Sequence, residues 1–509
     1  MKNIRYYLHA LLFSFSAPIA AYMMSMNIKT HAPPNSLWGA VTFCIFFCLV
    51  SVLITFVLTR DHLSSGMIAS FATLGILYTR DLFMLLITII LTASVVLSIL
   101  RRKLDLSPSY MLMNILSIGF AVYFGGSYIL FIHSAPWDMD VSMAESIRVT
   151  TPFPYTHKPD IYYIILDAYG GDKMLQKLHE FDNSGFISAL EKRGFVVIQE
   201  GKSNYTRTIH SVGSSLNMQY LDSVDRIMSE SYLWWPLTGT FANNETRKFL
   251  ESQGYHTANI ASGWSFTSLK DADFYSQPYP LFLNEFERFF VQNTNLSMLG
   301  FMGKYGVSIP SYDSHRKTVL YEFQQLGQIA TLMSPKFVFV HIVSPHPPFV
   351  FDAEGNPIDP DYQFTIADNR YLITPPAKYE KGYLDQVSFV NDQILQAVDA
   401  ILANSATPPI IILQGDHGPG NFLDAASESP PCFYERYSIL NALLLPGIQA
   451  TIVPQDLTPV NTFRMIFNLY FSANLEFLPN HQYFSTPEAV HYFSDVSDRI
   501  DDSCIFPSN

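Results

Sequence analysis

The sequence predicts a two-part protein, in which an N-terminal bundle of membrane-spanning helices precedes an α/β sandwich domain with a mainly parallel sheet. Nearly all the long apolar runs of the 509 residues lie before Pro136. After that residue, short aliphatic runs alternate with polar loops and amphipathic stretches. Strands and helices that alternate along a chain are typical of a parallel sheet covered on both faces. A chain of this length can also bury more than one core.

The first part, residues 1–136, is expected to be a membrane domain of about five helices. Its apolar segments lie near residues 4–24, 37–58, 63–78, 82–100 and 110–133, and because the third is short, four spans also fit. The positive-inside rule places the more basic loops in the cytoplasm. One side carries Lys2, Arg5, Arg60, Arg101, Arg102 and Lys103, and the other only Lys29 and Arg80. Five spans therefore put the large C-terminal domain outside the cytoplasm, and we expect the anchor to be retained because the apolar segments continue beyond the length of a leader.

The net charge of the chain differs on the two sides of Pro136. Residues 1–136 hold eight Lys or Arg and three Asp or Glu, whereas the remainder holds 23 basic and 41 acidic residues. An acidic domain argues against nucleic acid as a partner. For an anionic substrate, a bound metal ion would be a compact source of positive charge.

The external domain is expected over residues 160–509, after a proline-rich linker at 137–159. Its strand-like stretches are residues 160–167, 194–198, 255–261, 336–343, 409–416 and 441–447, and its clearest amphipathic helix is 383–402. Cys432 and Cys504 lie in this domain, where a disulfide could persist, although the sequence does not show whether they meet. In an open α/β sheet, ligands bind beyond the carboxyl ends of the strands.

Acidic and imidazole side chains follow two of these expected strands. Asp167 ends the first, and the stretch IIILQGDHG at 410–418 ends in Asp416 and His417 between two glycines, which are expected to allow a sharp turn. A cap or a turn would explain either site alone. Together they predict that Asp167, Asp416 and His417 bind one divalent ion. This ligand set suits Mn²⁺ or Zn²⁺ better than Mg²⁺.

A loop rich in Ser, Thr and Asn, residues 201–221, runs into a predicted helix. A hydroxyl near the helix start faces unpaired N–H groups and the positive end of the helix dipole, which favours an anion and a reactive oxygen. Ser203, Thr206 and Thr208 are all candidates, and simple capping is the alternative. The strand in HIVSPHPPF ends in His346, a candidate for metal ligation or substrate contact, whereas His341 lies inside the aliphatic run and is expected to be a core histidine.

This order of elements resembles the sulfatase-like branch of the alkaline phosphatase superfamily. With several N-terminal spans, the plan is most similar to lipoteichoic acid synthases and lipid A phosphoethanolamine transferases. The segment TRTIHSVG is similar to the nucleophile segment of the transferases, so the resemblance implies Thr206 as nucleophile and metal ligand, with Thr208 behind it. It also implies that His346 contacts the substrate phosphate or a second ion. Arg436, in ERYSILNALLLPG, would bind substrate or serve in packing.

The resemblance implies an enzyme of a bacterial inner (plasma) membrane with its catalytic domain on the extracytoplasmic, or periplasmic, side. Such an enzyme moves a phosphoglycerol- or phosphoethanolamine-like headgroup from a membrane lipid donor to an envelope glycan or glycolipid acceptor through a phospho-threonine. A hydrolase of phosphate or sulfate esters with the same site, and a non-catalytic envelope scaffold, are the alternatives. No histidine lies between His417 and His481, so a second ion has little support. The sulfatase pattern Cys-x-Pro-x-Arg is absent, and its serine version at Ser308 ends in Tyr.

Overall fold

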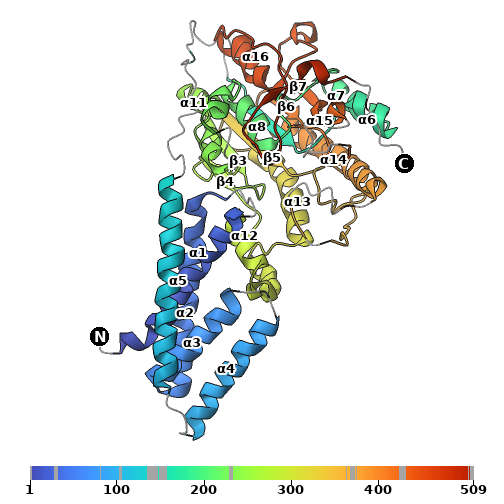
Figure 1. Cartoon of the computed structure of the whole chain (residues 1–509). Coiled ribbons are helices and arrows are strands. Elements are labelled where there is room, and N and C mark those ends of the chain that lie inside the picture. Colours follow the sequence, from blue (N-terminus) through green and yellow to red (C-terminus); the bar gives the residue numbers. More distant parts are fainter. Residues whose placement is uncertain are drawn as a thin grey trace. The chain divides into compact units, whose positions relative to one another are not determined.

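The structure is a computed structural model that divides into two compact units (Figure 1). Residues 1–138 and 279–310 form the first unit, and residues 139–278 and 311–509 form the second. The expected border at residue 136 lies close to this division, but the sequence did not predict the return of 279–310 to the first unit. The structure describes residues 3–27, 32–78, 80, 82–101, 106–134, 147, 158–228, 233–362, 364–366, 373, 375–422, 432–501 and 504. Most of the expected linker, 137–159, lies outside them.

The first unit is a helical bundle whose elements are mostly apolar. Three helical segments, 4–26, 34–59 and 107–134, are long and apolar enough to cross a membrane, whereas 62–77 and 85–96 are apolar but shorter. The described residues therefore contain three candidate spans where the sequence predicts five. The helices are α1 (Leu8–Asn27), α2 (Leu37–Thr59), α3 (His62–Leu77), α4 (Leu82–Arg101) and α5 (Ser107–Ser134), with 3-10 helices η1 (Ile4–Tyr7) and η2 (Pro34–Ser36).

Polar side chains join α1 to α3 inside this bundle. His9 Nδ1 lies 2.5 Å from Ser70 Oγ, and Ser14 Oγ lies 3.1 Å from Thr73 Oγ1. All four residues are buried. Small and hydroxyl-bearing residues let membrane helices approach closely and form hydrogen bonds with each other. Helices α12 (Glu285–Gln292) and η4 (Asn295–Tyr305) also belong to this unit.

The second unit contains a seven-stranded sheet in the order β2-β7-β6-β1-β5-β3-β4. Strand β1 lies at its centre and pairs in parallel with β5 and β6, whereas β7 is antiparallel to β6 and β2. The mainly parallel sheet that the sequence predicts is therefore confirmed. The strands are β1 (Ile161–Leu166), β2 (Val196–Val197), β3 (His256–Ile260), β4 (Phe274–Ser276), β5 (Lys336–Ile342), β6 (Ile410–Gln414) and β7 (Asn441–Leu444).

Helices cover both faces of the sheet. Alternate residues of β1 point to opposite faces, so that Tyr162 and Ile164 join a core with α6 (Asp172–His179), α7 (Ser184–Lys192), α13 (Tyr312–Ile329) and α14 (Pro376–Asn404). On the other face, the Tyr163 hydroxyl donates to Ser215 Oγ of α8 (Thr208–Asn217) at 2.9 Å. The Tyr163 ring packs on Phe463 of α16 (Pro459–Phe471). The domain is thus an α/β sandwich.

The remaining elements are short. Cys432, which caps α15, forms a disulfide with Cys504. The expected helix at 383–402 is part of the longer α14. The other elements are α9 (Asp222–Met228), α10 (Gly239–Ala242), α11 (Glu245–Ser252), α15 (Phe433–Tyr437), η3 (Trp235–Thr238), η6 (Ala450–Ile452), η7 (Ser497–Arg499), β8 (Tyr483–Phe484) and β9 (Ser494–Asp495).

Candidate metal centre

The carboxyl ends of β1, β5 and β6 meet at one edge of the sheet because the three strands are parallel neighbours. Leu166 pairs with Ile342 of β5, and Ile165 pairs with Gln414 of β6. Asp167 follows β1 directly, and Asp416 and His417 follow β6 by two and three residues. Side chains distant in the sequence are thereby brought to the same edge.

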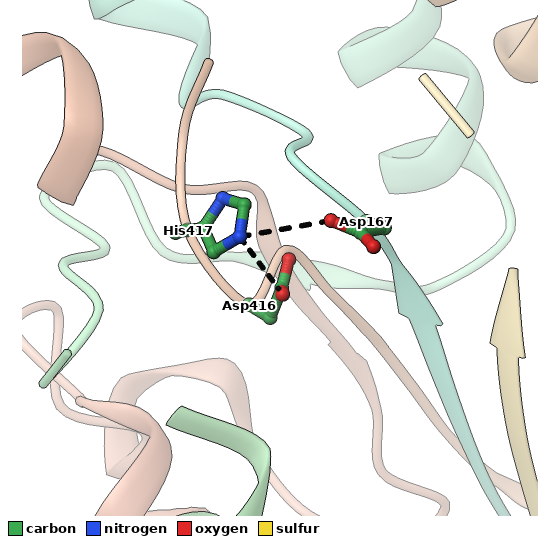
Figure 2. A group of neighbouring side chains, drawn as sticks. All are labelled: Asp167, Asp416 and His417. Atoms are coloured by element: carbon green, nitrogen blue, oxygen red, sulfur yellow. Dashed lines mark ion pairs between the residues drawn. The ribbon is translucent and has the colours of Figure 1, made fainter. Parts of the chain in front are cut away.

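Three buried ligand atoms converge there (Figure 2). One ligand atom each from Asp167, Asp416 and His417 lies within 4.8 Å of the other two. His417 Nε2 is 3.7 Å from Asp167 Oδ1 and 3.3 Å from Asp416 Oδ2. Among the described residues, neither of these carboxylate oxygens accepts a hydrogen bond. Buried polar atoms without partners are costly, so two such oxygens beside an imidazole fit a divalent ion. The role of these residues as ligands stays a prediction.

The backbone orients these side chains toward each other. The amide of Ala168, a residue with φ of 64°, donates to Asp416 Oδ1 at 3.0 Å and leaves Oδ2 free to face the site. The His417 ring places Nδ1 3.0 Å from Gly418 O, where Nδ1–H donates and Nε2 keeps its lone pair. This is the tautomer in which a neutral imidazole can bind a metal through Nε2.

The two glycines around Asp416 and His417 serve close packing, and not the sharp turn that the sequence suggests. Neither has a positive φ. A Cβ on Gly415 would lie 2.3 Å from Tyr169 O, and one on Gly418 would lie 2.0 Å from Glu435 O. The neighbouring backbone therefore leaves no room for a side chain at either position.

Burial and mutual charge set the protonation of the site. Burial and the facing Asp167 carboxylate raise the pKa of Asp416 to about 6. Burial alone would raise the pKa of Asp167, but His346 and the hydrogen-bonded His341 lower it overall. Burial and the neighbouring Arg436 lower the pKa of His417 to about 3, so its ring is neutral at pH 7. The site thus holds buried negative charge that a dication would offset.

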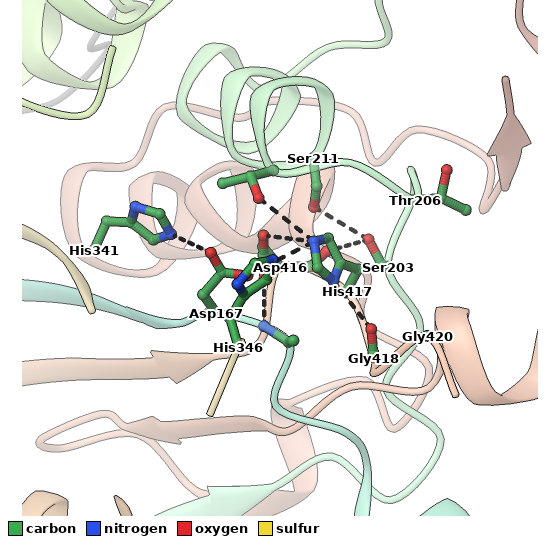
Figure 3. Close-up of polar contacts among 12 residues, drawn as sticks. Asp167, Ser203, Thr206, Ser211, His341, His346, Asp416, His417, Gly418 and Gly420 are labelled. Carbon is green, nitrogen blue, oxygen red and sulfur yellow. Dashed lines mark hydrogen bonds and ion pairs between the residues drawn. The ribbon is translucent and has the colours of Figure 1, made fainter. Parts of the chain in front are cut away.

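His341 is buried, as expected of a core histidine, and it also contacts the site (Figure 3). Its Nε2 lies 3.2 Å from Asp167 Oδ2, and its Nδ1 lies 3.3 Å from Thr267 Oγ1. His341 therefore donates to Asp167 Oδ2, the carboxylate oxygen that faces away from His417. The signal for this contact is the strand register, which pairs His341 with Ile165, two residues before Asp167 on the same face of the sheet. That register is not visible in the sequence.

Asp167, Asp416 and His417 are called the triad below, and of the three candidate hydroxyls only that of Thr208 contacts a side chain of the triad in the described part of the chain. Thr208 is the first residue of α8, and its Oγ1 lies 3.4 Å from His417 Nε2. It is also close enough to Asp416 to lower the pKa of that carboxyl, against the larger effects of burial and Asp167. The Thr206 side chain, which the resemblance favours, lies apart from the triad in Figure 3.

Ser203 and Thr206 have other contacts. The Ser203 hydroxyl lies 2.7 Å from Tyr205 O and 2.5 Å from Asp416 O, which ties the loop to the end of β6. The Thr206 carbonyl accepts from Arg436 Nε at 3.0 Å and Nη2 at 2.8 Å. Both residues therefore position the loop that precedes Thr208.

The two expected substrate-binding residues lie beside the triad. The His346 and His417 ring centroids are 6.5 Å apart, and His346 Nδ1 lies 2.6 Å from Pro347 O, where it donates. The buried Arg436 donates from Nη1 to Gly418 O at 3.0 Å and places Nη2 3.3 Å from His417 Nε2. Arg436 thus serves in packing, which is one of the two roles expected for it, and it also brings positive charge to the site.

Comparisons with known proteins identify the family. The family model described as sulfatase matches residues 159–432, just over half of the chain. Among curated proteins, no relative matches the sequence. A similar solved structure is the periplasmic domain of EcEptC from Escherichia coli in complex with Zn, with 12% identity over 68% of this chain and 95% of that chain and a TM-score of 0.43.

Two further solved structures are similar. One is the integral membrane protein lipooligosaccharide phosphoethanolamine transferase A (EptA) from Neisseria meningitidis, with 11% identity over 91% of this chain and 95% of that chain and a TM-score of 0.42. The other is BT33494S-sulf from Bacteroides thetaiotaomicron, with 15% identity over 67% and 83% and a TM-score of 0.40. The family match shows that the chain belongs to the sulfatase family, as a sulfatase-like enzyme of the alkaline phosphatase superfamily with apolar N-terminal helices.

Proposed function

We propose that this protein is a metal-dependent transferase that moves a phospho-headgroup from a membrane lipid to an envelope glycan or glycolipid, with Thr208 as nucleophile in place of Thr206. The observation that carries this proposal is the position of the Thr208 hydroxyl, 3.4 Å from His417 Nε2 at the start of α8. Among the described residues of 201–221, neither Ser203 nor Thr206 places its hydroxyl against a side chain of the triad, since the Ser203 hydroxyl reaches only the Asp416 carbonyl.

Thr208 has two features of an activated hydroxyl. It lies in the first turn of α8, where unpaired backbone N–H groups and the helix dipole favour negative charge on a nearby oxygen. It is also buried beside Asp167, Asp416 and His417, the residues that would hold the ion. A divalent ion there would act as a Lewis acid and make the hydroxyl easier to deprotonate near neutral pH.

The reaction balances as two displacements at phosphorus. In the first, Thr208 Oγ forms a bond to the headgroup phosphorus, the bond from phosphorus to the diacylglycerol oxygen breaks, and that oxygen takes up a proton. In the second, an acceptor hydroxyl displaces Thr208 Oγ, which regains a proton. His346, beside His417, would donate to the leaving oxygen from Nε2 in its protonated form, because its Nδ1–H already donates to Pro347 O. Arg436 holds the loop before Thr208 through the Thr206 carbonyl.

The proposal also includes the kind of metal ion, the kind of lipid donor and the side of the membrane on which the second unit lies. Two carboxylates, an imidazole and a hydroxyl suit Mn²⁺ or Zn²⁺ better than Mg²⁺. A membrane anchor raises the effective concentration of a lipid donor with a phosphoglycerol- or phosphoethanolamine-like headgroup. The basic loops on the side of Arg60 and Arg101 support an extracytoplasmic, or periplasmic, position for the second unit.

A hydrolase with the same site is the second candidate, because the family model that matches the chain is that of sulfatases. In that case water replaces the acceptor hydroxyl in the second displacement. A lipid donor with an isotope-labelled headgroup, incubated with the full-length protein in nanodiscs and envelope glycolipid, separates the two. Label in the glycolipid supports the transferase, and label released only as the free headgroup phosphate supports the hydrolase.

Intact-mass analysis of the full-length protein tests the nucleophile. After incubation with donor lipid and without acceptor, the parent and Thr206→Ala should gain the mass of the phospho-headgroup, and Thr208→Ala should not. Thr208→Ser should keep the adduct because it keeps the hydroxyl. An adduct on Thr208→Ala that is absent from Thr206→Ala would restore Thr206 as nucleophile, and no adduct on the parent would overturn the covalent route.

A further inference from the structure

Residues 279–310, here called the inserted segment, leave the second unit and pack on the helical bundle of the first. The ring of Phe286 lies 5.3 Å from that of Tyr22 in α1. Asn284 Nδ2 donates to Ser36 O at 3.0 Å, before the start of α2. Asn295 Nδ2 donates to Gly75 O near the end of α3 at 2.7 Å. The inserted segment therefore packs as part of the helical bundle.

All these contacts lie at one end of the bundle. Tyr22 is near the end of α1, Ser36 precedes α2, and Gly75 is near the end of α3. The opposite end holds the N-terminus and Arg60, which belong to the basic, cytoplasmic side. The inserted segment thus lies at the extracytoplasmic ends of helices α1 to α3. Because helices that cross a bilayer end in its headgroup layer, the depth of the segment is fixed by the helices that it contacts.

The inserted segment has apolar side chains on two sides. Phe286, Phe290 and Leu296 are buried inside the first unit. A second set is exposed: Leu281 at 55%, Met298 at 63%, Phe301 at 56% and Tyr305 at 75%. Each exposed apolar side chain is more stable in an apolar environment than in water. Trp38, at the start of α2, is exposed at the same end of the bundle, and aromatic residues of this kind are enriched at the membrane interface.

We propose that Leu281, Met298, Phe301 and Tyr305 insert into the outer boundary between lipid headgroups and acyl chains, as an interfacial anchor of the first unit. The exposed Lys304 between Phe301 and Tyr305 would meet lipid phosphates. The bilayer is the partner that fits, because the inserted segment contacts Ser36, just before the start of α2, a helix whose own apolar side chains are exposed. Segments of this kind lie in the membrane plane with their apolar side chains in the interface.

Spin labels at Phe301→Cys and Tyr305→Cys test the depth of the inserted segment. The full-length protein, with Cys44 and Cys48 replaced by Ala and its disulfide kept, is placed in nanodiscs of phosphatidylethanolamine and phosphatidylglycerol. Access to dissolved oxygen is then compared with access to a water-soluble nickel complex. The matched control is Tyr492→Cys, at a residue of the second unit that is also 56% exposed.

The labels at positions 301 and 305 should favour oxygen, and the label at 492 should favour the nickel complex. Labels at 301 and 305 with the same nickel access as the control would overturn the proposal. Labels shielded from both reagents and broadened by a neighbouring label would overturn it in favour of a second copy of this chain. The measurement does not involve catalysis, so a failed mass-adduct experiment and a failed depth experiment can be told apart.

Discussion

His341 shows how a single residue outside the triad can control it. Its Nε2 lies 3.2 Å from Asp167 Oδ2, and this contact fixes the direction of Asp167 Oδ1 toward His417. Partners of metal ligands typically contribute about 10–100-fold to metal affinity. We expect His341→Gln to weaken Mn²⁺ or Zn²⁺ binding by about that factor, measured by isothermal titration calorimetry.

The control for this prediction is His256→Gln. His256 begins β3 in the same sheet and is half-buried, with its ring 3.6 Å from Asp273. The His256→Gln variant should leave metal affinity unchanged. Equal losses in both variants would mean that the effect comes from the sheet and not from the contact with Asp167.

The two carboxylates of the triad predict how stability responds to metal removal. Without an ion, the buried Asp167 and Asp416 repel each other, which is one reason that the pKa of Asp416 is raised to about 6. In excess chelator at pH 8, Asp416→Asn should therefore melt at a higher temperature than the parent. With Mn²⁺ or Zn²⁺ the order should reverse, because the variant loses a ligand. The control is the exposed Asp361→Asn, whose Tm should change as that of the parent does in both conditions. If neither chelator nor metal changes the Tm of the parent, that result would count against a metal site.

His179 predicts a pH-dependent part of the stability. Its buried ring places Nδ1 2.8 Å from Glu380 Oε1 and Nε2 3.4 Å from Glu435 Oε1. Burial disfavours the charged ring, but Glu435 and Glu380 outweigh it and raise the pKa of His179 above 6.5. The stabilisation is thus full below pH 6.5 and is lost as the pH rises through the higher folded-state pKa.

Melting curves of the parent and His179→Gln across pH 6 to 9 check this sign. The difference in Tm should be largest at pH 6 and should shrink as the pH rises. Gln176→Ala, an exposed change in the same helix, should shift Tm equally at every pH. A difference that grows with pH would show that the ring is neutral in the folded protein.

At the scale of elements, α14 holds the loop that carries His346. Gln386 Nε2 donates to Pro345 O at 3.2 Å and to His346 O at 3.1 Å, and its Oε1 accepts from Val350 N at 2.7 Å. Gln386→Leu leaves these backbone groups without a partner, which costs on the order of 1–3 kcal/mol in unfolding free energy. We expect kcat to fall, because the loop that carries His346 loses these hydrogen bonds. Metal affinity should stay near that of the parent, because His346 is outside the triad.

The exposed Gln396→Leu in the same helix is the control and should change neither quantity. Loss of metal affinity in Gln386→Leu would show that the loop supports the triad and not only His346. Together, kcat, metal affinity and unfolding free energy separate these two roles of α14.

At the scale of the whole molecule, the chain passes between the two units near residues 138, 278 and 310. A protease site inserted near residue 138 should therefore leave the second unit with the membrane after cleavage, because the inserted segment still packs on α1 and α3. Membrane sedimentation and gel analysis would measure the retained fraction. A variant with further cleavage sites near 278 and 310 should release the second unit, and release by the single cut would contradict the packing of the inserted segment.

Much of the plan follows from local sequence patterns. Long apolar runs before Pro136 predict the helical unit, and short aliphatic runs predict a parallel sheet, because hydrophobic periodicity depends only on neighbouring residues. The triad follows as well, since Asp167, Asp416 and His417 each come soon after a strand and parallel neighbours end at the same edge of a sheet.

Contacts between distant segments needed the tertiary structure. The direction of the Thr208 hydroxyl depends on where α8 begins, and the contact of His341 with Asp167 depends on the register of β5 against β1. The packing of residues 279–310 on the bundle and the pairing of Cys432 with Cys504 join segments far apart in the chain. The sequence by itself determined a set of candidate residues for the site and the strands that end near them. Only the tertiary structure decided which of those side chains touch, because long-range packing sets their direction and no local pattern records it.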